Sequence, residues 1–208
     1  MNIPFWEESY KDDSVSTFGT QPNATLVEFA GQLDPARAAL DVGCGDGKNA
    51  LYLAGLGFAQ VDAFDLSQSA VDKLRRLAAA RAVRVNAWVQ DLTRFAFEKP
   101  YGLVMSFGTL HFVERERWHA FIRAAQESTL PNGIHILQIF TDSVPASPDI
   151  APFAVGLARE GEIQTLYGDW DILQFKSYTF EDEHPGVPKH VHASNKIVAR
   201  KKGNPKSV

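Results

Sequence analysis

The segment Ala38-Ala39-Leu40-Asp41-Val42-Gly43-Cys44-Gly45-Asp46-Gly47 decides the fold of this 208-residue chain. Its apolar first half predicts a buried β-strand, and the glycines that follow predict a tight turn into a helix. Glycine lets the backbone approach a ligand closely, and the free N–H groups at a helix start meet polar or anionic groups. The pattern is typical of folds that bind nucleotide-like ligands, with a purely structural turn as the alternative.

Short apolar runs and helical stretches alternate on both sides of this turn, which indicates a parallel sheet built from βαβ units. Capping-box spacings predict that helices begin near Ser69 and, before the first strand, near Thr25. Leu130-Pro131-Asn132-Gly133 predicts a turn. Strands are expected at residues 38–42, 60–64, 83–89, 101–106 and 134–140, and helices at 48–56, from 69 to about 81, and at 114–128.

The pattern changes after residue 140. Three prolines mark a loop, residues 162–167 predict a short helix, and residues 170–180 and 190–201 predict two antiparallel strands. Together these elements predict an α/β, Rossmann-like, seven-stranded mixed sheet with its last strand antiparallel and helices on both faces. We expect one domain, divided into an N-terminal lid and helix (1–36), cofactor-binding βα units (37–140), a substrate-side loop and hairpin (141–202) and a tail (203–208).

Composition and charge exclude several function classes. Charged residues make up 22% of the chain and hydrophobic residues 45%, so a folded core is expected. The net charge of −4 gives no reason to expect a nucleic-acid partner, and the basic run Arg200-Lys201-Lys202 fits a solvated tail. Cys44 is the only cysteine, which excludes an intramolecular disulfide and a cysteine-based zinc site.

The expected location of the protein follows from two features that the sequence lacks, a secretory signal and a membrane span. The start of the chain, MNIPFWEESYKDD, lacks the basic and apolar regions of a secretory signal. No apolar run approaches the ~18 residues of a membrane span. A cytoplasmic protein without a membrane partner is therefore expected, and both a monomer and a dimer stay open.

Acidic residues follow the glycine turn at the ends of successive strands. The turn reads G-x-G-x-G, and Lys48 stands where a dinucleotide fingerprint requires its third glycine. Asp65, about 20 residues after the turn, is placed to accept hydrogen bonds from two ribose hydroxyls. Its alternative role as a helix cap is already served by Ser67 and Ser69. Asp91, which could equally be a turn residue, follows the third strand and could accept a hydrogen bond from an adenine amino group.

With these residues in place, the sequence resembles the class I S-adenosylmethionine methyltransferases. The resemblance rests on ALDVGCGDGKNALYLAGLGF, VDAFDLS, VQDL and YGLVMSFGTLHF. Within that class the chain is most similar to the tellurite-resistance methyltransferase group (TehB-like), a likeness that extends to FWEESY near the start and to GEI and WDIL further on.

The resemblance implies S-adenosylmethionine as the cofactor and assigns residues to it. The glycine turn and Asp65 would hold the methionine and ribose parts, Asp91 and Leu92 the adenine, and the turn Ser106-Phe107-Gly108 would pass beneath the methyl donor. Because Ser106-Phe107-Gly108-Thr109 replaces the Asn/Asp-Pro-Pro-aromatic tetrad of amino-methyltransferases, methylation of a nucleic-acid base is not expected. The expected cofactor-binding residues are Asp41, Gly43, Cys44, Gly45, Asp65, Leu66, Asp91, Leu92 and Ser106.

The acceptor is expected to be a small molecule that attacks the methyl group in line, so that positioning does most of the work. A soft anion such as a thiolate, selenide or reduced tellurium needs little base catalysis, whereas a hydroxyl needs a base. Candidate bases are His111 after the fourth strand and, on the hairpin, His190 and His192 with His184 nearby. A solvated polar strand face explains the hairpin histidines equally well. No metal site is expected, because no carboxylate lies at a recognisable spacing from them.

Aromatic residues provide the remaining candidates for the acceptor pocket. Trp6 and Tyr10 are spaced to share a helix face and could cover the cofactor, where a sulfonium gains from aromatic rings. A hydrophobic clamp on the core is the alternative. Phe107 would line the pocket from the turn after the fourth strand.

Three hypotheses for the function follow from the sequence. The first is a small-molecule methyltransferase, with tellurite, selenium or a thiol as acceptor, or an O- or N-acceptor in a metabolite. A nicotinamide-dependent oxidoreductase is disfavoured by Lys48 and by the terminal hairpin. A non-catalytic cofactor-binding module is the third, because almost no side chain is obligatory for methyl transfer.

Overall fold

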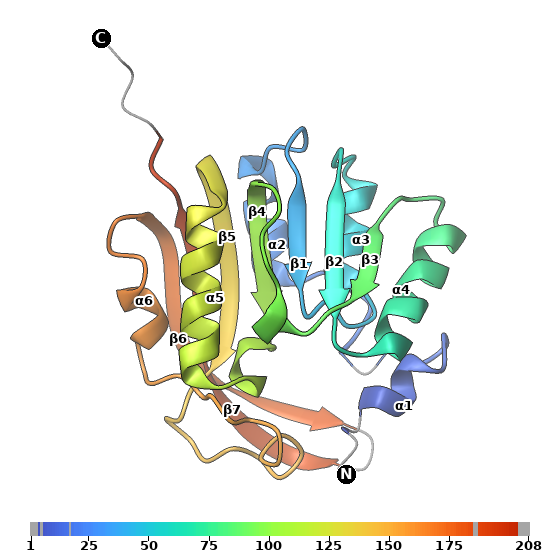
Figure 1. The fold of residues 1–208 in the computed structure, drawn as a ribbon. Coiled ribbons are helices and arrows are strands. Elements are labelled where there is room, and N and C mark those ends of the chain that lie inside the picture. Colours follow the sequence, from blue (N-terminus) through green and yellow to red (C-terminus); the bar gives the residue numbers. More distant parts are fainter. Residues whose placement is uncertain (1–3, 5, 17, 185–186, 204–208) are drawn as a thin grey trace.

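The computed structural model describes residues 4, 6–16, 18–184 and 187–203, without the side chains of residues 184 and 187. Within these residues, seven strands form one sheet in the order β3-β2-β1-β4-β5-β7-β6 (Figure 1). Strands β1 to β5 are parallel, and β7 runs antiparallel to both β5 and β6. The predicted mixed sheet is therefore confirmed. The strands are β1 (Ala39–Val42), β2 (Val61–Asp65), β3 (Asn86–Val89), β4 (Tyr101–Phe107), β5 (Thr129–Phe140), β6 (Asp171–His184) and β7 (Val187–Arg200).

Helices cover both faces of the sheet, because successive side chains of a strand point to opposite faces. Ala39 and Val61 belong to a core with residues of α2, α3 and α4, whereas Leu40 and Val42 pack in a second core with residues of α5 and α6. The helices are α1 (Trp6–Tyr10), α2 (Ala24–Phe29), α3 (Lys48–Gly55), α4 (Gln68–Ala80), α5 (Arg115–Glu127) and α6 (Glu162–Thr165), with short 3-10 turns η1 (Ala30–Gln32), η2 (Leu92–Arg94) and η3 (Leu110–Phe112).

Two helix starts differ from the predictions. Helix α4 begins after Ser67, whose hydroxyl accepts a hydrogen bond from the Ala70 N–H at 3.1 Å, so Ser69 lies inside the helix. Helix α2 is capped by Asn23, which accepts from the Thr25 N–H, and not by Thr25. In both cases a side chain two residues earlier reaches the free N–H groups, and the sequence alone does not rank such neighbouring caps.

The strand boundaries also differ from the predictions. The segment expected as a turn before residue 134 is part of β5: Asn132, with φ of +63°, bends the strand while its N–H still donates to the Lys201 carbonyl. Strand β3 is shorter than expected and begins at Asn86. The hairpin strands are longer, since residues 181–184 and 187–189, expected as a loop, are strand.

The long β6–β7 hairpin reaches below the carboxyl ends of the parallel strands and extends toward α1 (Figure 1). The second half of β7 pairs with residues Ile134 to Phe140 of β5. The first half of β7 extends beyond β5 and pairs with β6. The hairpin therefore closes the edge of the sheet at which open α/β folds bind ligands. Among the described residues, no helix has the length and apolar character that crossing a membrane requires.

Candidate functional site

The glycine turn joins β1 to α3 with its backbone in conformations that favour glycine. Gly43 and Gly45 have φ of +66° and +54°. A β-carbon on Gly43 would lie 2.1 Å from the Thr109 Oγ1 atom, which leaves no room for any larger residue. The N–H groups of Gly43 and Cys44 both donate to the Phe64 carbonyl, so the turn is fixed to the end of β2.

Asp65 ends β2 beside this turn. Its carboxylate accepts hydrogen bonds from the backbone N–H groups of Gly45 and Ser67, both at 2.9 Å. Burial raises the pKa of Asp65 above its ordinary value, although these hydrogen bonds oppose the rise. Because Ser67 caps α4, Asp65 is not needed as a cap, and its remaining lone pairs are available to a ligand. The neighbouring Leu66 is 72% exposed.

Asp41 lies buried at the end of β1. Its Oδ2 atom has no hydrogen-bond partner among the described residues. Burial, and then the charge of Asp65, raise the pKa of Asp41 to about 7. The adjacent Cys44 thiol is also buried, and burial raises its pKa well above the ordinary value, so it stays protonated at neutral pH. Two buried carboxyl groups at one sheet edge favour a cationic ligand there.

Asp91 and Leu92 follow β3. Asp91 Oδ1 accepts from the Thr93 N–H and the Thr93 hydroxyl, both at 2.8 Å, and thereby caps η2. The hydrogen bond of the Thr93 hydroxyl holds the pKa of Asp91 below its ordinary value. The turn role considered for Asp91 is therefore present, and its Oδ2 atom lies 3.8 Å from Arg94 Nε. Leu92 is buried, so its contribution to a ligand would come from its backbone.

Ser106 and Phe107 end β4 next to β1. The Ser106 hydroxyl is buried and donates to the Val42 carbonyl at 3.1 Å, which fixes the spacing of the two strands. Phe107 is half-buried against the core on the α3 side. Both residues therefore lie at the carboxyl edge, where the sequence placed them.

The N-terminal segment packs over the glycine turn. Tyr10 is 5% exposed, and its hydroxyl would lie 3.0 Å from a β-carbon on Gly45. Burial and the charge of Asp65 raise the Tyr10 pKa well above its usual value. Trp6 packs against Phe112 and Phe153 with ring centroids 5.2 and 5.9 Å away. The segment thus contacts both the turn and the loops on the hairpin side of the sheet.

Buried Lys73 of α4 holds this segment in place, a role that sequence reasoning missed. Its Nζ atom donates to the carbonyl of Ser9 at 3.1 Å and to that of Val15, and it lies 3.5 Å from Asp46 of the turn. Lys48, which stands where a dinucleotide fingerprint has its third glycine, donates to the Phe18 carbonyl. Both lysines therefore hold the segment against the glycine turn and helices α3 and α4.

Lys73→Met is expected to release the N-terminal segment and to lower the free energy of unfolding by roughly 2 kcal/mol, because two carbonyls and Asp46 lose their partner. Urea unfolding and the rate of tryptic cleavage after Lys11 would measure the two effects. Lys176→Met is the control, since its 54% exposed side chain pairs only loosely with Glu28 at 3.8 Å. Unchanged cleavage in the Lys73 variant would contradict this role.

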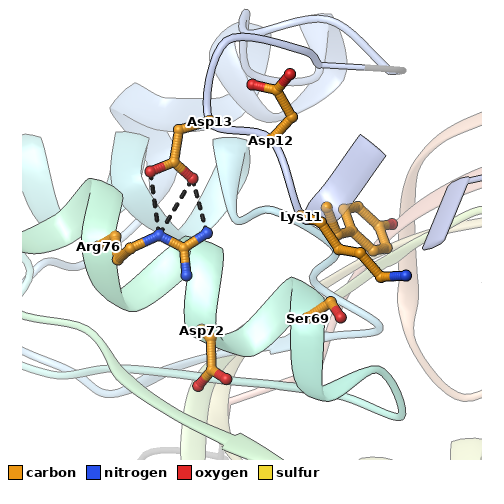
Figure 2. Close-up of a pocket in the computed structure, with 7 residues that line it drawn as sticks. Lys11, Asp12, Asp13, Ser69, Asp72 and Arg76 are labelled. Carbon is orange, nitrogen blue, oxygen red and sulfur yellow. Dashed lines mark hydrogen bonds and ion pairs between the residues drawn. The ribbon is translucent and has the colours of Figure 1, made fainter. Parts of the chain in front are cut away.

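An open groove of about 530 Å³ lies between the N-terminal segment and α4 (Figure 2). Asp13 on one side pairs with Arg76 on the other through hydrogen bonds of 2.7–3.2 Å. Of the residues expected in the site, only Tyr10 lines this groove. The glycine turn, Asp65 and Asp91 are not among its lining residues, so this groove is distinct from the site expected at the carboxyl edge of the sheet.

The hairpin histidines lie against a loop that the sequence did not connect with them. His190 Nε2 is 3.0 Å from His192 Nε2 and 3.5 Å from an oxygen of Asp149, in the loop between β5 and α6. His192 is 4% exposed, so the alternative of a solvated strand face does not apply to this residue. A carboxylate does lie beside the histidines, which removes the reason for expecting no metal site. Because Asp149 is far from the histidines in the sequence, no motif spacing indicated that they meet. The side chain of His184, the third candidate of the hairpin, lies outside the described residues.

His111 lies buried in η3 and stacks on Phe140 at 4.3 Å between centroids, which in turn stacks on His192 at 4.5 Å. Neither imidazole nitrogen of His111 has a hydrogen-bond partner among the described residues. Burial lowers its pKa to about 3, with a smaller contribution from His192. A group with such a pKa is a weak base at neutral pH, so His111 fits the wall of a pocket better than a general base.

Several known proteins are similar to this chain over most of its length. A family model described as "Tellurite resistance protein TehB" matches residues 7–185. A protein of Haemophilus influenzae (strain 10810) named "Probable S-adenosyl-L-methionine-dependent methyltransferase TehB" is 28% identical over 189 residues. The alignment covers 88% of this chain and 63% of that protein.

Two further proteins are similar over most of the chain. A "2-heptyl-1-hydroxyquinolin-4(1H)-one methyltransferase" of Mycobacteroides abscessus is 26% identical over 155 residues, which cover 73% of this chain and 66% of that protein. The crystal structure of TehB from Haemophilus influenzae shares the fold with a TM-score of 0.77 at 23% identity, covering 95% of this chain and 66% of that one. This chain thus spans about two thirds of the length of these three proteins.

Proposed function

The chain belongs to the TehB tellurite resistance protein family, and from this premise we propose that it transfers a methyl group from S-adenosylmethionine to a small-molecule acceptor. The observation that carries the proposal is the buried Asp65 carboxylate, bound to the Gly45 N–H at the carboxyl edge of β1 and β2. Asp91 and Leu92 follow at the end of the adjacent strand β3, so one elongated ligand could contact all of them.

The residues present fit this methyl donor. When bound, S-adenosylmethionine supplies an electrophilic methyl group on a sulfonium sulfur. Asp65 would accept hydrogen bonds from the ribose hydroxyls with the lone pairs left by Gly45 and Ser67. Asp41, whose Oδ2 has no partner among the described residues, would face the cationic methionine end through the turn. The glycines would admit the donor close to the backbone, and Tyr10 would exclude water above it.

Leu66→Ala is expected to weaken S-adenosylmethionine binding about fivefold to tenfold, because the exposed leucine would lose apolar contact with the adenine ring. Calorimetry measures the affinity. The thermal midpoint without donor should stay within about 1 °C, since a side chain this exposed contributes little to the core. Leu56→Ala, at 46% exposure and at the end of α3 remote from the glycine turn, is the matched control. Equal affinities for the two variants would contradict the adenine contact.

On the acceptor side we propose a soft anion, with a tellurium or selenium oxyanion or its reduced form first and an organic thiolate next. This choice is supported by the family and by the aromatic stack of His192, Phe140 and His111, which would give the acceptor a polarisable surface. A soft anion needs little base catalysis, and His111 is only a weak base. A hydroxyl acceptor is the second candidate. It is favoured by the relative named as a hydroxyquinolone methyltransferase, and it would require deprotonation by the less buried His190.

A screen with methyl-labelled S-adenosylmethionine tests the proposal. The untagged chain is incubated with tellurite, selenite, their thiol-reduced products, small thiols, phenols and carboxylates, and labelled products are separated. Turnover of a chalcogen compound is expected. Turnover of phenols alone would replace the first acceptor class by the second. Binding of NAD without binding of S-adenosylmethionine would overturn the methyltransferase, and donor binding without turnover of any acceptor would favour the non-catalytic module.

A further inference from the structure

Asp149, His190 and His192 form a cluster that the donor site does not use. The two histidines come from β7, and Asp149 comes from the turn at residues 147–151, which is closed by hydrogen bonds from Ile150 and Ala151 to the Ser147 carbonyl. One potential ligand atom from each of the three residues lies within 4.8 Å of the others. We propose that this cluster binds a divalent transition-metal ion, for which zinc is the best fit.

The first argument is the burial of Asp149. Its side chain is 1% exposed, and neither carboxylate oxygen accepts a hydrogen bond from any described residue. A buried charge without hydrogen bonds is strongly unfavourable unless a cation compensates it. The nearest described groups that could supply positive charge are the two imidazoles, so the cluster requires either a proton shared by the histidines or a metal ion.

The second argument is the orientation of His190. Its Nδ1 atom lies 2.8 Å from the Pro188 carbonyl oxygen. A carbonyl can only accept, so Nδ1 carries the hydrogen, and in a neutral ring Nε2 presents its lone pair to His192 and Asp149. This arrangement, with one nitrogen fixed by a backbone carbonyl and the other directed at the ion, is the common one for metal-binding histidine.

The third argument is the spacing of the ligand atoms. His190 Nε2 lies 3.0 Å from His192 Nε2 and 3.5 Å from Asp149 Oδ2. Ligands at 2.0–2.1 Å in tetrahedral coordination are separated by about 3.3–3.4 Å, so both distances from His190 Nε2 are already within a few tenths of an ångström of those in such a site. The His192 ring is already held between Phe140 and Phe180, with centroids 4.5 and 5.3 Å away.

The choice of ion follows from the ligands. Two imidazoles and one carboxylate suit zinc and its first-row neighbours, whereas magnesium and calcium prefer oxygen atoms throughout. Three protein ligands leave a fourth position open, as in catalytic zinc sites. That position would take water, or an oxygen or chalcogen atom of the acceptor. Binding of the acceptor there rests on the proposed function, whereas binding of the ion does not.

Zinc calorimetry on the untagged full chain, stripped with EDTA and exchanged into chelator-free buffer, tests the proposal. One equivalent of Zn²⁺ is expected to bind per chain. Asp149→Asn and His192→Ala should each weaken binding by roughly a hundredfold or more, because loss of an outer-shell partner alone costs about 10–100-fold. Co²⁺ should give visible absorption of tetrahedral type in the wild type and lose it in both variants.

His119→Ala is the matched control, because His119 also pairs with a carboxylate, Glu162 at 2.8 Å, but on α5 and α6. Its zinc affinity should equal that of the wild type. The proposal is overturned if the wild type binds no single equivalent, or if Asp149→Asn and His192→Ala both leave the affinity unchanged.

Donor binding, measured separately with EDTA present, shows that each variant is folded. It also separates this proposal from the function, since zinc binding without donor binding would disprove only the latter.

Discussion

Asp65→Ala is expected to weaken S-adenosylmethionine binding at least a hundredfold. In the wild type the carboxylate is oriented by the N–H groups of Gly45 and Ser67, and its free lone pairs would accept two ribose hydroxyls. Hydrogen bonds to a charged group contribute about 1.5–3 kcal/mol each. Since about 1.4 kcal/mol corresponds to a tenfold change in affinity, losing both predicts a factor of a hundred or more. Calorimetry on the purified variant measures it.

Two controls make this result interpretable. Asp72→Ala removes a carboxylate of α4 that is 45% exposed and pairs with Arg75, and it should leave donor affinity unchanged. Circular dichroism of Asp65→Ala checks that the turn still folds without its hydrogen bonds to the carboxylate. If the folded variant bound the donor as tightly as the wild type, the placement of the ribose would be wrong.

The donor-free protein is expected to lose stability as the pH rises through the range in which Asp41 ionises, and Asp41→Asn should remove most of this loss. Burial and the charge of Asp65 raise the Asp41 pKa to about 7, against about 3.9 in the unfolded chain. Between these values the folded state holds a proton that the unfolded state has lost. The stabilisation is therefore complete below about pH 4 and is lost as the pH rises through about 7.

The size of this effect follows from the shift of roughly three pKa units, at 1.36 kcal/mol each, or about 4 kcal/mol in total. Urea unfolding of both proteins at pH 5, 6, 7 and 8 measures it as a difference in slope. The raised pKa of Asp65 acts in the same direction in both proteins. Parallel profiles for wild type and variant would show that Asp41 does not titrate in this range.

The donor half of the site could be predicted from the sequence because its signals are local. The G-x-G-x-G turn requires backbone conformations that glycine adopts, and Asp65 follows within one βα unit, so short segments place both residues at the same sheet edge. The structure brings Gly45 and Asp65 into direct contact. The sequence placed Asp91 at the end of the correct strand. Its spacing did not show whether the residue would be a turn residue or a ligand-binding acid, and in the structure its Oδ1 atom caps η2.

The acceptor half depends on contacts between distant segments, which no periodicity records. His190 and His192 were recognised as candidates, yet Asp149 stands in a proline-rich loop without any metal-binding spacing. Lys73 lies in an ordinary amphipathic helix, and only its packing against Ser9 and Val15 gives it a role. His111 was considered a base, whereas full burial makes it a weak one.

The sequence by itself determined the sheet and the edge at which the glycine turn, Asp65 and Asp91 gather, because glycine conformations, strand alternation and βα connections are fixed over a few residues. Tertiary structure alone decided which side chains meet on the acceptor side and how strongly they are buried. Burial sets the cost of a charge and therefore the chemistry of each histidine and carboxylate. The free-energy cost of a charge depends on every segment packed around it. For the histidine cluster, this cost could therefore be judged only from the folded arrangement of the hairpin and the loop that contains Asp149.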